Sequence, residues 1–229
     1  MTIANKATEV AIGRYNRTAP VYDFMEGLAE RSRYSVWRRM LWSKVEGGNI
    51  LEVGVGTGKN FPYYPAGAEV TAVDFSENML ARARDKAQKQ GVKARLLQMD
   101  VQHLEFEDNI FDTVVASFVF CSVPDPVSGL SEIERVCKPE GKVALLEHVL
   151  SANRILGWLM NMANPLVVRM MGANINRRTA DNVVNSGLRI EKVTDLGMNI
   201  FKLIEARKTT ISFGGCKSSG KVGQLGGMT

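Results

Sequence analysis

The chain has 229 residues, of which 45% are hydrophobic and 23% are charged, and its net charge is +5. These values suit one globular α/β domain with a sizeable core, and the three scattered cysteines exclude a disulfide framework. The absence of a CxxC pair or a His-rich cluster gives no reason to expect a metal site, and a reducing cytoplasm is the expected location. The mildly basic charge permits attraction to nucleic acid or to an anionic membrane surface and does not choose between them.

The elements are predicted in chain order from apolar periodicity. Residues 24–42 predict a helix within an N-terminal helical lid, 1–46, whose first 13 residues lack the apolar core of a signal peptide. Mostly apolar runs then predict five strands, at 49–55, 69–75, 94–100, 111–120 and 141–149. Between them, helices are predicted at 77–90, between Ser76 as N-cap and Gly91 as C-cap, and at 126–138. Strands that alternate with helices favour a doubly wound, mostly parallel sheet.

The C-terminal part of the chain extends this sheet. Two strand-like runs, 188–197 and 199–208, predict an antiparallel hairpin at its edge, which makes seven strands in all. The core therefore spans 47–208, and an insertion at 152–187 with an apolar helix and a second helix from about Thr179 interrupts it. The Gly/Ser-rich tail, 209–229, has almost nothing to bury and is expected to be disordered.

A glycine-rich turn follows the first predicted strand. A P-loop would need glycine at Val53 and a hydroxyl residue at Asn60, so Lys59 is not a phosphate-binding lysine. The glycines at 54, 56 and 58 are also one residue closer together than the dinucleotide-binding pattern requires. The turn is thus expected to hold a ligand other than a nucleoside triphosphate or a dinucleotide.

The pattern E-x-G-x-G-x-G in this turn resembles motif I of the class I S-adenosylmethionine-dependent methyltransferases. The resemblance covers about residues 14–208, and Asp74, Asp100 and the Ser117-Phe118 pair follow the next three strands in the matching order. It implies that Asp74 accepts from both ribose hydroxyls, that Asp100 accepts from the adenine amino group, and that Ser117 and Phe118 lie beside the methionine part. The implied cofactor-binding residues are Glu52, Gly54, Gly56, Gly58, Asp74, Phe75, Met79, Asp100, Val101, Ser117 and Phe118. The alternative for each acid is a strand-end carboxylate that backbone amides satisfy, and Glu52 is expected to order the glycine turn as well.

Two kinds of residue are candidates for catalysis. His148 ends the fifth strand, beside the expected methyl end of the cofactor, and histidine is the side chain whose free pKa lies near neutrality. The stretch RYNRTAPVYD, with Tyr15 and Tyr22, resembles the N-terminal lid of the quinone-biosynthesis and phosphatidylethanolamine N-methyltransferase groups, where a tyrosine covers the cofactor. The alternatives are a histidine that orders the following loop and tyrosines that belong to the core of the lid.

The insertion bears on the methyl acceptor. No charge lies between Arg154 and Arg169, and this run, which is expected to break at Pro165, is too short to span a bilayer. With Arg177 and Arg178 nearby, it suits an interfacial segment on anionic lipid or a pocket for an amphiphile with a phosphate, and Arg154, Arg177 and Arg178 are the predicted substrate-binding residues. The alternative is a cap helix that packs over the site. The stretch GANINRRT is similar to bacterial phospholipid N-methyltransferases and to a related thiol-methylating group.

The resemblance therefore implies an S-adenosylmethionine-dependent methyltransferase for a small-molecule or lipid acceptor, with the amine of phosphatidylethanolamine as the first choice. Carbon methylation of a quinone precursor, methylation of a small thiol and a non-catalytic S-adenosylmethionine-binding protein are the alternatives. Nucleic acid is not an expected partner, because an Asn/Asp-Pro-Pro-Tyr/Phe motif is absent after the fourth strand and the basic residues are spread out. The expected location is the cytoplasm, with peripheral contact on the inner membrane face.

Overall fold

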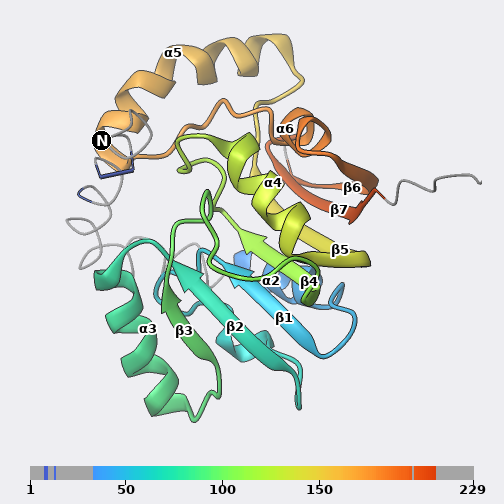
Figure 1. Ribbon diagram of the computed structural model, residues 1–229. Helices are drawn as coiled ribbons and strands as arrows, with labels where there is room; N and C mark the ends of the chain where they lie inside the picture. Colours follow the sequence, from blue (N-terminus) through green and yellow to red (C-terminus); the bar gives the residue numbers. More distant parts are fainter. Residues whose placement is uncertain (1–7, 10–12, 14–32, 198, 210–229) are drawn as a thin grey trace, which may run out of the picture.

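The computed structural model describes residues 8, 9, 13, 33–197 and 199–209. Their strands form one seven-stranded sheet in the order β3-β2-β1-β4-β5-β7-β6 (Figure 1). Strands β1 to β5 pair in parallel, and β7 is antiparallel to both β5 and β6. The strands are β1 (Asn49–Val53), β2 (Glu69–Asp74), β3 (Arg95–Gln98), β4 (Phe111–Ser117), β5 (Cys137–His148), β6 (Leu188–Gly197) and β7 (Phe201–Lys208). The predicted doubly wound sheet with a C-terminal antiparallel hairpin is confirmed.

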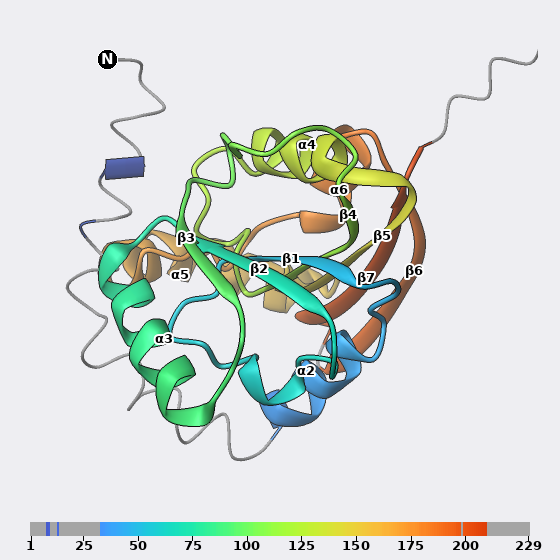
Figure 2. The ribbon, with the colours of Figure 1, turned by 60° about the horizontal axis from the view of Figure 1, so that its bottom comes forward.

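Helices cover both faces of this sheet (Figure 2). Side chains alternate along each strand, so Ile50 of β1 packs in one hydrophobic cluster with α2, whereas Leu51 packs in another with α4. The face of Ile50 carries α2 (Ser35–Trp42), the 3₁₀ helix η2 (Phe61–Tyr63) and α3 (Glu77–Gln90). The face of Leu51 carries α4 (Pro126–Val136) and α6 (Thr179–Asn185).

Local capping explains where α3 begins and ends and where α4 begins. The Ser76 hydroxyl accepts from the Met79 amide at 3.3 Å, and Gly91 ends α3 in the left-handed conformation, as the sequence predicts. Asp125 caps α4 by accepting from the amides of Val127 and Ser128. These ends are readable from sequence because each cap involves only neighbouring residues.

The strands differ from the predicted ranges where the backbone turns. Strand β1 ends before Gly54, at φ +68°, and β4 ends before Phe118, which takes φ +58°. The residues between the predicted helix at 126–138 and the predicted strand at 141–149 are instead an irregular part of β5, which begins at Cys137 because Cys137 pairs with Phe111 of β4. The predicted boundary at 141 was therefore wrong.

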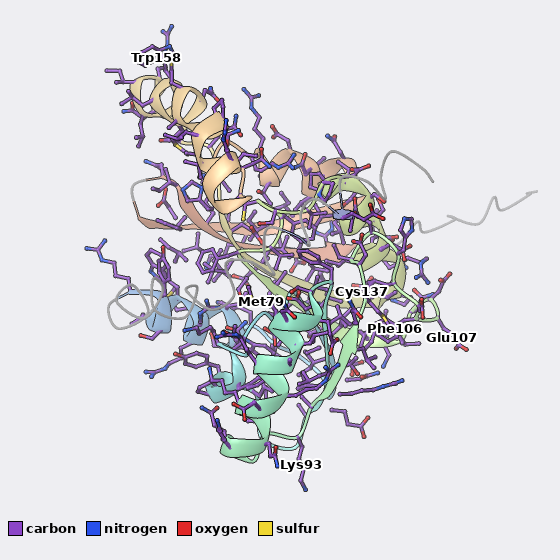
Figure 3. The ribbon with its side chains drawn as sticks, turned by 90° about the vertical axis from the view of Figure 1, so that its left-hand side faces the viewer. Met79, Lys93, Phe106, Glu107, Cys137 and Trp158 are labelled. Carbon is purple, nitrogen blue, oxygen red and sulfur yellow. The ribbon has the colours of Figure 1, made fainter. Side chains whose placement is uncertain are left out.

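Helix α5 (Arg154–Met171) is continuous through Pro165, so the predicted break at this proline was wrong. Proline removes one amide donor, and the carbonyl that loses its partner belongs to Asn161 on the exposed side of the helix, where water can replace the bond. The helix stands apart from the sheet, and Trp158 projects away from the body of the molecule (Figure 3). None of the described helices has the length and apolarity that crossing a membrane requires.

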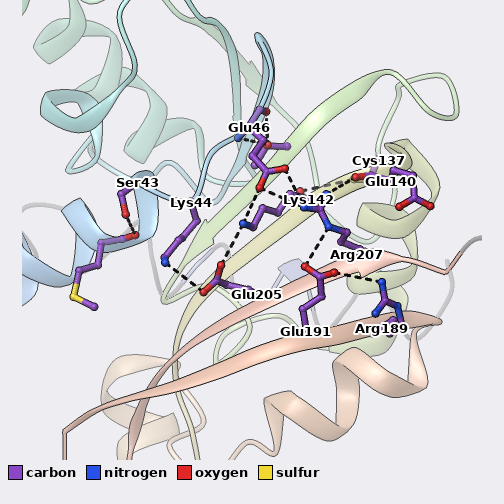
Figure 4. A network of polar contacts seen from close by, with 12 residues as sticks. Ser43, Lys44, Glu46, Cys137, Glu140, Lys142, Arg189, Glu191, Glu205 and Arg207 are labelled. Atoms are coloured by element: carbon purple, nitrogen blue, oxygen red, sulfur yellow. Dashed lines mark hydrogen bonds and ion pairs between the residues drawn. The ribbon is translucent and has the colours of Figure 1, made fainter.

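An ionic network fastens the C-terminal hairpin to the central sheet (Figure 4). The ammonium of Lys142, on β5, lies 3.0 Å from Glu46 Oε1 and 3.2 Å from Glu205 Oε2 on β7. Arg207 also contacts Glu46, and Lys44 contacts Glu205. The network thus joins the segment before β1 to β5 and β7.

Several sequence predictions fall outside the described residues. They concern Tyr15, Tyr22, most of the lid at 1–46 and the tail beyond Thr209.

Candidate functional site

A cavity opens at the carboxyl edge of the sheet, between β1 and β4, where the strand order reverses direction. Open α/β sheets bind ligands at this position. The cavity is open to solvent on one side, and together with this mouth it spans about 730 Å³. Its walls are Thr8, Val53, Gly54, Gly56, Val73, Asp74, Phe75, Met79, Met99, Asp100, Val101, Ser117, Phe118, Val119, Ser122, Val123 and Pro124. The structure therefore brings together every predicted cofactor residue except Glu52 and Gly58.

Glycine occupies two positions in the turn after β1 for different geometric reasons. A Cβ at Gly54 would lie 2.4 Å from Val119 Cγ2, so only glycine lets the turn approach the end of β4 this closely. At Gly56, which takes φ +55°, no atom lies within 4 Å of the Cβ position. The backbone at Gly56 is therefore open for a ligand to approach.

Asp74 holds this turn in place. Its Oδ2 accepts from the Gly56 amide at 2.8 Å and its Oδ1 from the Ser76 amide at 2.9 Å. Burial raises the pKa of Asp74 to about 6, although the two backbone bonds act in the opposite direction. Each carboxylate oxygen keeps a further lone pair, so Asp74 can also accept from two adjacent hydroxyl groups in the cavity.

Asp100 lies at the far end of the cavity, after β3. It accepts from the Gln102 amide at 3.0 Å and from the Thr8 hydroxyl at 3.1 Å. The side chains of Met99 and Val101 flank it on the cavity wall. This end combines a carboxylate with apolar side chains, which suits a flat heterocycle that carries an amino group.

Glu52 and Gly58, the two predicted cofactor residues that do not line the cavity, lie behind its wall. Glu52 is fully buried, and its oxygens accept from the side-chain amide of Asn60, at 2.6 Å, and from the Tyr64 hydroxyl. Burial raises the pKa of Glu52, while the bonds from Tyr64 and Asn60 act against this. At Gly58 a Cβ would lie 2.3 Å from the Phe61 ring. Both residues shape the turn from beneath, which agrees with the ordering role expected of Glu52.

Glu147 is a structural residue that the sequence interpretation missed. Its Oε1 accepts from the amides of Val119, at 2.9 Å, and Phe120, at 3.3 Å, and thereby holds the cavity loop after β4. The residue is completely buried, and burial raises its pKa to about 7. A signal was present in the sequence, because a lone acid inside the apolar run VALLEHV rarely lacks a specific partner.

His148 does not line the cavity. Strand alternation sends Glu147 to one face of the sheet and His148 to the other, where its ring meets Phe201 with centroids 5.1 Å apart. Burial lowers the pKa of His148, and no described residue hydrogen-bonds its Nδ1. The expected place beside the cavity is thus not observed, since Phe201 packs between His148 and the cavity-lining Phe118. Its catalytic role stays a prediction.

The segment after α5 forms hydrogen bonds with the loop that follows β4 and lines the cavity. Asn174 donates from its backbone amide, at 2.7 Å, and from its side chain to the Cys121 carbonyl. Arg177 donates to the carbonyl of Val123, a wall residue, at 2.9 Å, and no described residue pairs with its buried Nε. Of the three predicted substrate arginines, Arg177 therefore adjoins the cavity, whereas Arg154 and Arg178 are exposed farther away.

The sheet order and the cavity at its reversal point define a Rossmann-like ligand-binding protein. The methyltransferase domain family matches residues 51–145. The chain is 41% identical over 140 residues to phosphatidylethanolamine N-methyltransferase of Cereibacter sphaeroides, covering 60% of this chain and 68% of the relative. It is 33% identical over 190 residues to demethylmenaquinone methyltransferase of Lactobacillus johnsonii, covering 77% and 78%.

Solved structures agree at the level of the fold. A SAM-dependent methyltransferase of Thermotoga maritima matches with a TM-score of 0.67 at 19% identity, covering 87% of this chain and all of that one. Geranyl diphosphate methyltransferase in complex with SAM matches with a TM-score of 0.62 at 15% identity, covering 76% and 85%. The chain belongs to the class I S-adenosylmethionine-dependent methyltransferases, and S-adenosylmethionine is its cofactor.

The cavity residues fit this cofactor. Asp74 offers a carboxylate for a ribose diol, and Asp100 with Val101 offers an acid and an apolar wall for adenine. The open backbone at Gly56 leaves room for the amino-acid part. When bound, the cofactor supplies an electrophilic methyl group on a sulfonium.

Proposed function

We propose that the protein methylates the amine of phosphatidylethanolamine, and that it does so at the inner surface of the cytoplasmic membrane. The cofactor would lie along the carboxyl edge of the sheet, with its ribose at Asp74, its adenine between Asp100, Val101 and Met79, and its methionine part at Ser117 and Phe118. Gly54 and Phe75 would contact it, and Glu52 and Gly58 would shape the turn.

The observation that carries this proposal is the outer face of α5. Five large apolar side chains on it are 50% to 74% exposed, at positions that share one side of a helix: Ile155, Trp158, Leu159, Met162 and Leu166. Solvated helices in soluble proteins rarely leave such a stripe uncovered. The stripe would insert at the boundary between headgroups and acyl chains.

Charge supports an anionic membrane as the surface that α5 meets. From residue 148 to residue 180 the chain has no acidic residue, and four arginines lie at 154, 169, 177 and 178. Arg154 and Arg169 are exposed at the two ends of the apolar stripe. Anionic lipids attract basic residues in this position by about 1 kcal/mol for each residue near the surface.

The acceptor side of the cavity suits an amphiphile with a phosphate. Arg177, beside wall residue Val123, would bind the phosphate through its guanidinium. The amine must lose a proton before it attacks the methyl group. The apolar walls, among them Phe118, Val119 and Pro124, favour its neutral form, because desolvation lowers the pKa of an ammonium.

Carbon methylation of a quinone precursor is the second candidate. The relative from Lactobacillus johnsonii carries that name and matches the longer stretch of the chain. An apolar ring would also suit the walls formed by Val119 and Val123. Methylation of a small thiol, or cofactor binding without catalysis, would need neither the phosphate site nor the membrane.

A labelled-methyl assay distinguishes these acceptors. Purified protein with methyl-labelled cofactor is incubated with vesicles that contain phosphatidylethanolamine, with a demethylated quinol in the same vesicles, or with small thiols. We expect label in the phosphatidylethanolamine fraction, and Arg177→Met should lower it tenfold or more while cofactor affinity stays unchanged. Arg189→Met, on exposed β6, is the matched control. Label only in the quinol or thiol fraction, or in none, would refute the proposed acceptor.

Flotation with vesicles tests the membrane surface separately. The double variant Trp158→Ser/Leu159→Ser should lose most of its binding to anionic vesicles. Val184→Ser, which removes an equally exposed valine from α6, should bind like the unchanged protein. Equal flotation of all three proteins would exclude α5 as the contact.

The proposed catalytic residues are His148, Tyr15 and Tyr22. His148→Ala should slow methyl transfer and leave cofactor affinity intact, because His148 does not line the cavity. Full turnover in this variant would remove His148 from the mechanism. The variants Tyr15→Phe and Tyr22→Phe test the two tyrosines in the same assay.

A further inference from the structure

A ring of three hydrogen bonds joins Arg38, Asn60 and Ser117 beneath the cavity. Arg38 Nη1 donates to Asn60 Oδ1 at 3.0 Å and to Ser117 Oγ at 2.9 Å. Asn60 Nδ2 closes the ring by donating to the same Ser117 oxygen at 2.9 Å. All three side chains are buried, and they come from α2, from the turn after β1 and from the end of β4.

Arg38 fixes the direction of the bonds in this ring, because a guanidinium can only donate. The Asn60 oxygen must therefore face Arg38, and its NH₂ group faces Ser117 and Glu52 Oε1, the latter at 2.6 Å. Burial raises the pKa of Glu52, and the nearby Arg38 guanidinium acts in the opposite direction.

Ser117 is left with a single hydrogen-bonding capacity. A hydroxyl has two lone pairs and one proton, and Arg38 and Asn60 occupy both lone pairs. Among the residues that the structure describes, none accepts the Ser117 proton. Because Ser117 lines the cavity, this proton is available to a ligand there.

We propose that Arg38 and Asn60 are positioning residues that make Ser117 an obligate donor to the carboxylate of the cofactor's methionine part. This inference rests on the proposed placement of that part at the end of β4. A carboxylate matches the site because it accepts hydrogen bonds, and the guanidinium of Arg38 directly behind Ser117 adds favourable positive potential. The ammonium of the same moiety would need an acceptor, which Ser117 cannot provide.

The test compares two ligands that differ only in this carboxylate. Calorimetry measures the affinities of S-adenosylmethionine and of decarboxylated S-adenosylmethionine, and their ratio gives the preference for the carboxylate. Ser117→Ala should reduce this ratio about tenfold or more, the range for a hydrogen bond to a charged group. Ser117→Thr, which keeps the hydroxyl, should retain it.

Arg38→Met tests the positioning role. It should reduce the same ratio, because Ser117 then regains a free lone pair and a freely rotating proton. Arg39→Met, its exposed neighbour on α2, is the matched control and should leave the ratio unchanged.

Each outcome has a definite meaning. If Arg38→Met weakens both ligands equally, Arg38 only supports the fold and the inference is wrong. If Ser117→Ala leaves the ratio unchanged, the cofactor does not place its carboxylate there and the proposed placement fails too. If circular dichroism shows that Arg38→Met does not fold, Arg38→Lys replaces it, and an unchanged ratio in Arg38→Lys with a reduced ratio in Ser117→Ala supports a charge-based role. An unchanged ratio in both overturns the inference.

Discussion

At the scale of single residues, Asp74 connects the shape of the site to its chemistry. The same carboxylate holds Gly56 and Ser76 through their amides and faces the cavity. An amide in its place could accept only one of these bonds, and its NH₂ group would oppose the other donor. The shape of the turn after β1 and the proposed ribose contact therefore depend on the same carboxylate.

We expect Asp74→Asn to weaken S-adenosylmethionine binding at least tenfold, which corresponds to about 1.4 kcal/mol or more. Glu69→Gln, at the exposed start of the same strand, is the control. Because burial raises the pKa of Asp74 to about 6, affinity in the unchanged protein should also fall as the pH drops from 7.5 to 5. Calorimetry at both pH values measures this, and unaltered affinity in Asp74→Asn would contradict the assigned role.

The raised pKa of Glu147 predicts that stability changes with pH in the direction opposite to that of most acids. Its pKa of about 7 in the folded chain lies above its ordinary value of 4.5, so the folded state binds more protons between these values. The free energy of unfolding should therefore fall as the pH rises from 4.5 to 7, by up to about 3 kcal/mol. Glu147→Gln keeps the acceptor for Val119 and Phe120 and should remove the part of this dependence that Glu147 contributes, whereas Asp74, whose pKa is raised to about 6, keeps its own part.

Urea denaturation of the cofactor-free protein at pH 5 and pH 7.5 checks this prediction. Glu107→Gln, an exposed acid, should behave like the unchanged protein. If Glu147→Gln shows the same loss of stability with rising pH as the unchanged chain, Glu147 does not titrate as inferred.

At the scale of elements, the start of α4 depends on one cap. Asp125 accepts from the amides of Val127 and Ser128, and the helix it begins carries Leu130 and Ile133 into the core. Asp125→Ala should lower the free energy of unfolding by about 1 kcal/mol, whereas Asp125→Asn should cost only a few tenths. Equal losses in urea denaturation for the two variants would show that the capping bonds are not the cause.

The elements also differ in how far the sequence predicts them. Helix α3 matches its prediction at both ends, because Ser76 and Gly91 act on neighbouring amides. Strand β5 and helix α5 were predicted less well. The start of β5 depends on pairing with Phe111, far away in the chain. Helix α5 continues through Pro165, and Asn161, whose carbonyl loses its partner, lies on the exposed side of the helix.

At the scale of the whole molecule, Lys142 links segments that are distant in sequence. It is almost buried between Glu46 and Glu205, so removing its charge leaves Glu205 without its nearest buried partner. We expect Lys142→Met to lower the free energy of unfolding by about 3 kcal/mol, the range for breaking a buried ion pair. Lys44→Met removes a more exposed charge from the same network and should cost less than about 1 kcal/mol.

Urea denaturation at low salt measures both variants. Similar losses of unfolding free energy in Lys142→Met and Lys44→Met would show that burial does not decide the strength of this network. A larger loss for Lys142→Met that 1 M salt does not change would support it, since screening acts mainly on exposed charges.

The sequence by itself determined the class of fold, the cofactor and the strand ends that line the cavity. Gly54, Asp74, Asp100 and Ser117 follow successive strands, and parallel strands bring their carboxyl ends to one edge, so order in the chain becomes proximity in space. Only the tertiary structure decided which side chains face the cavity. Glu52 and His148 lie near that edge in sequence, yet strand alternation and packing direct them to other surroundings. The bonds among Arg38, Asn60 and Ser117 likewise form only when three distant segments meet.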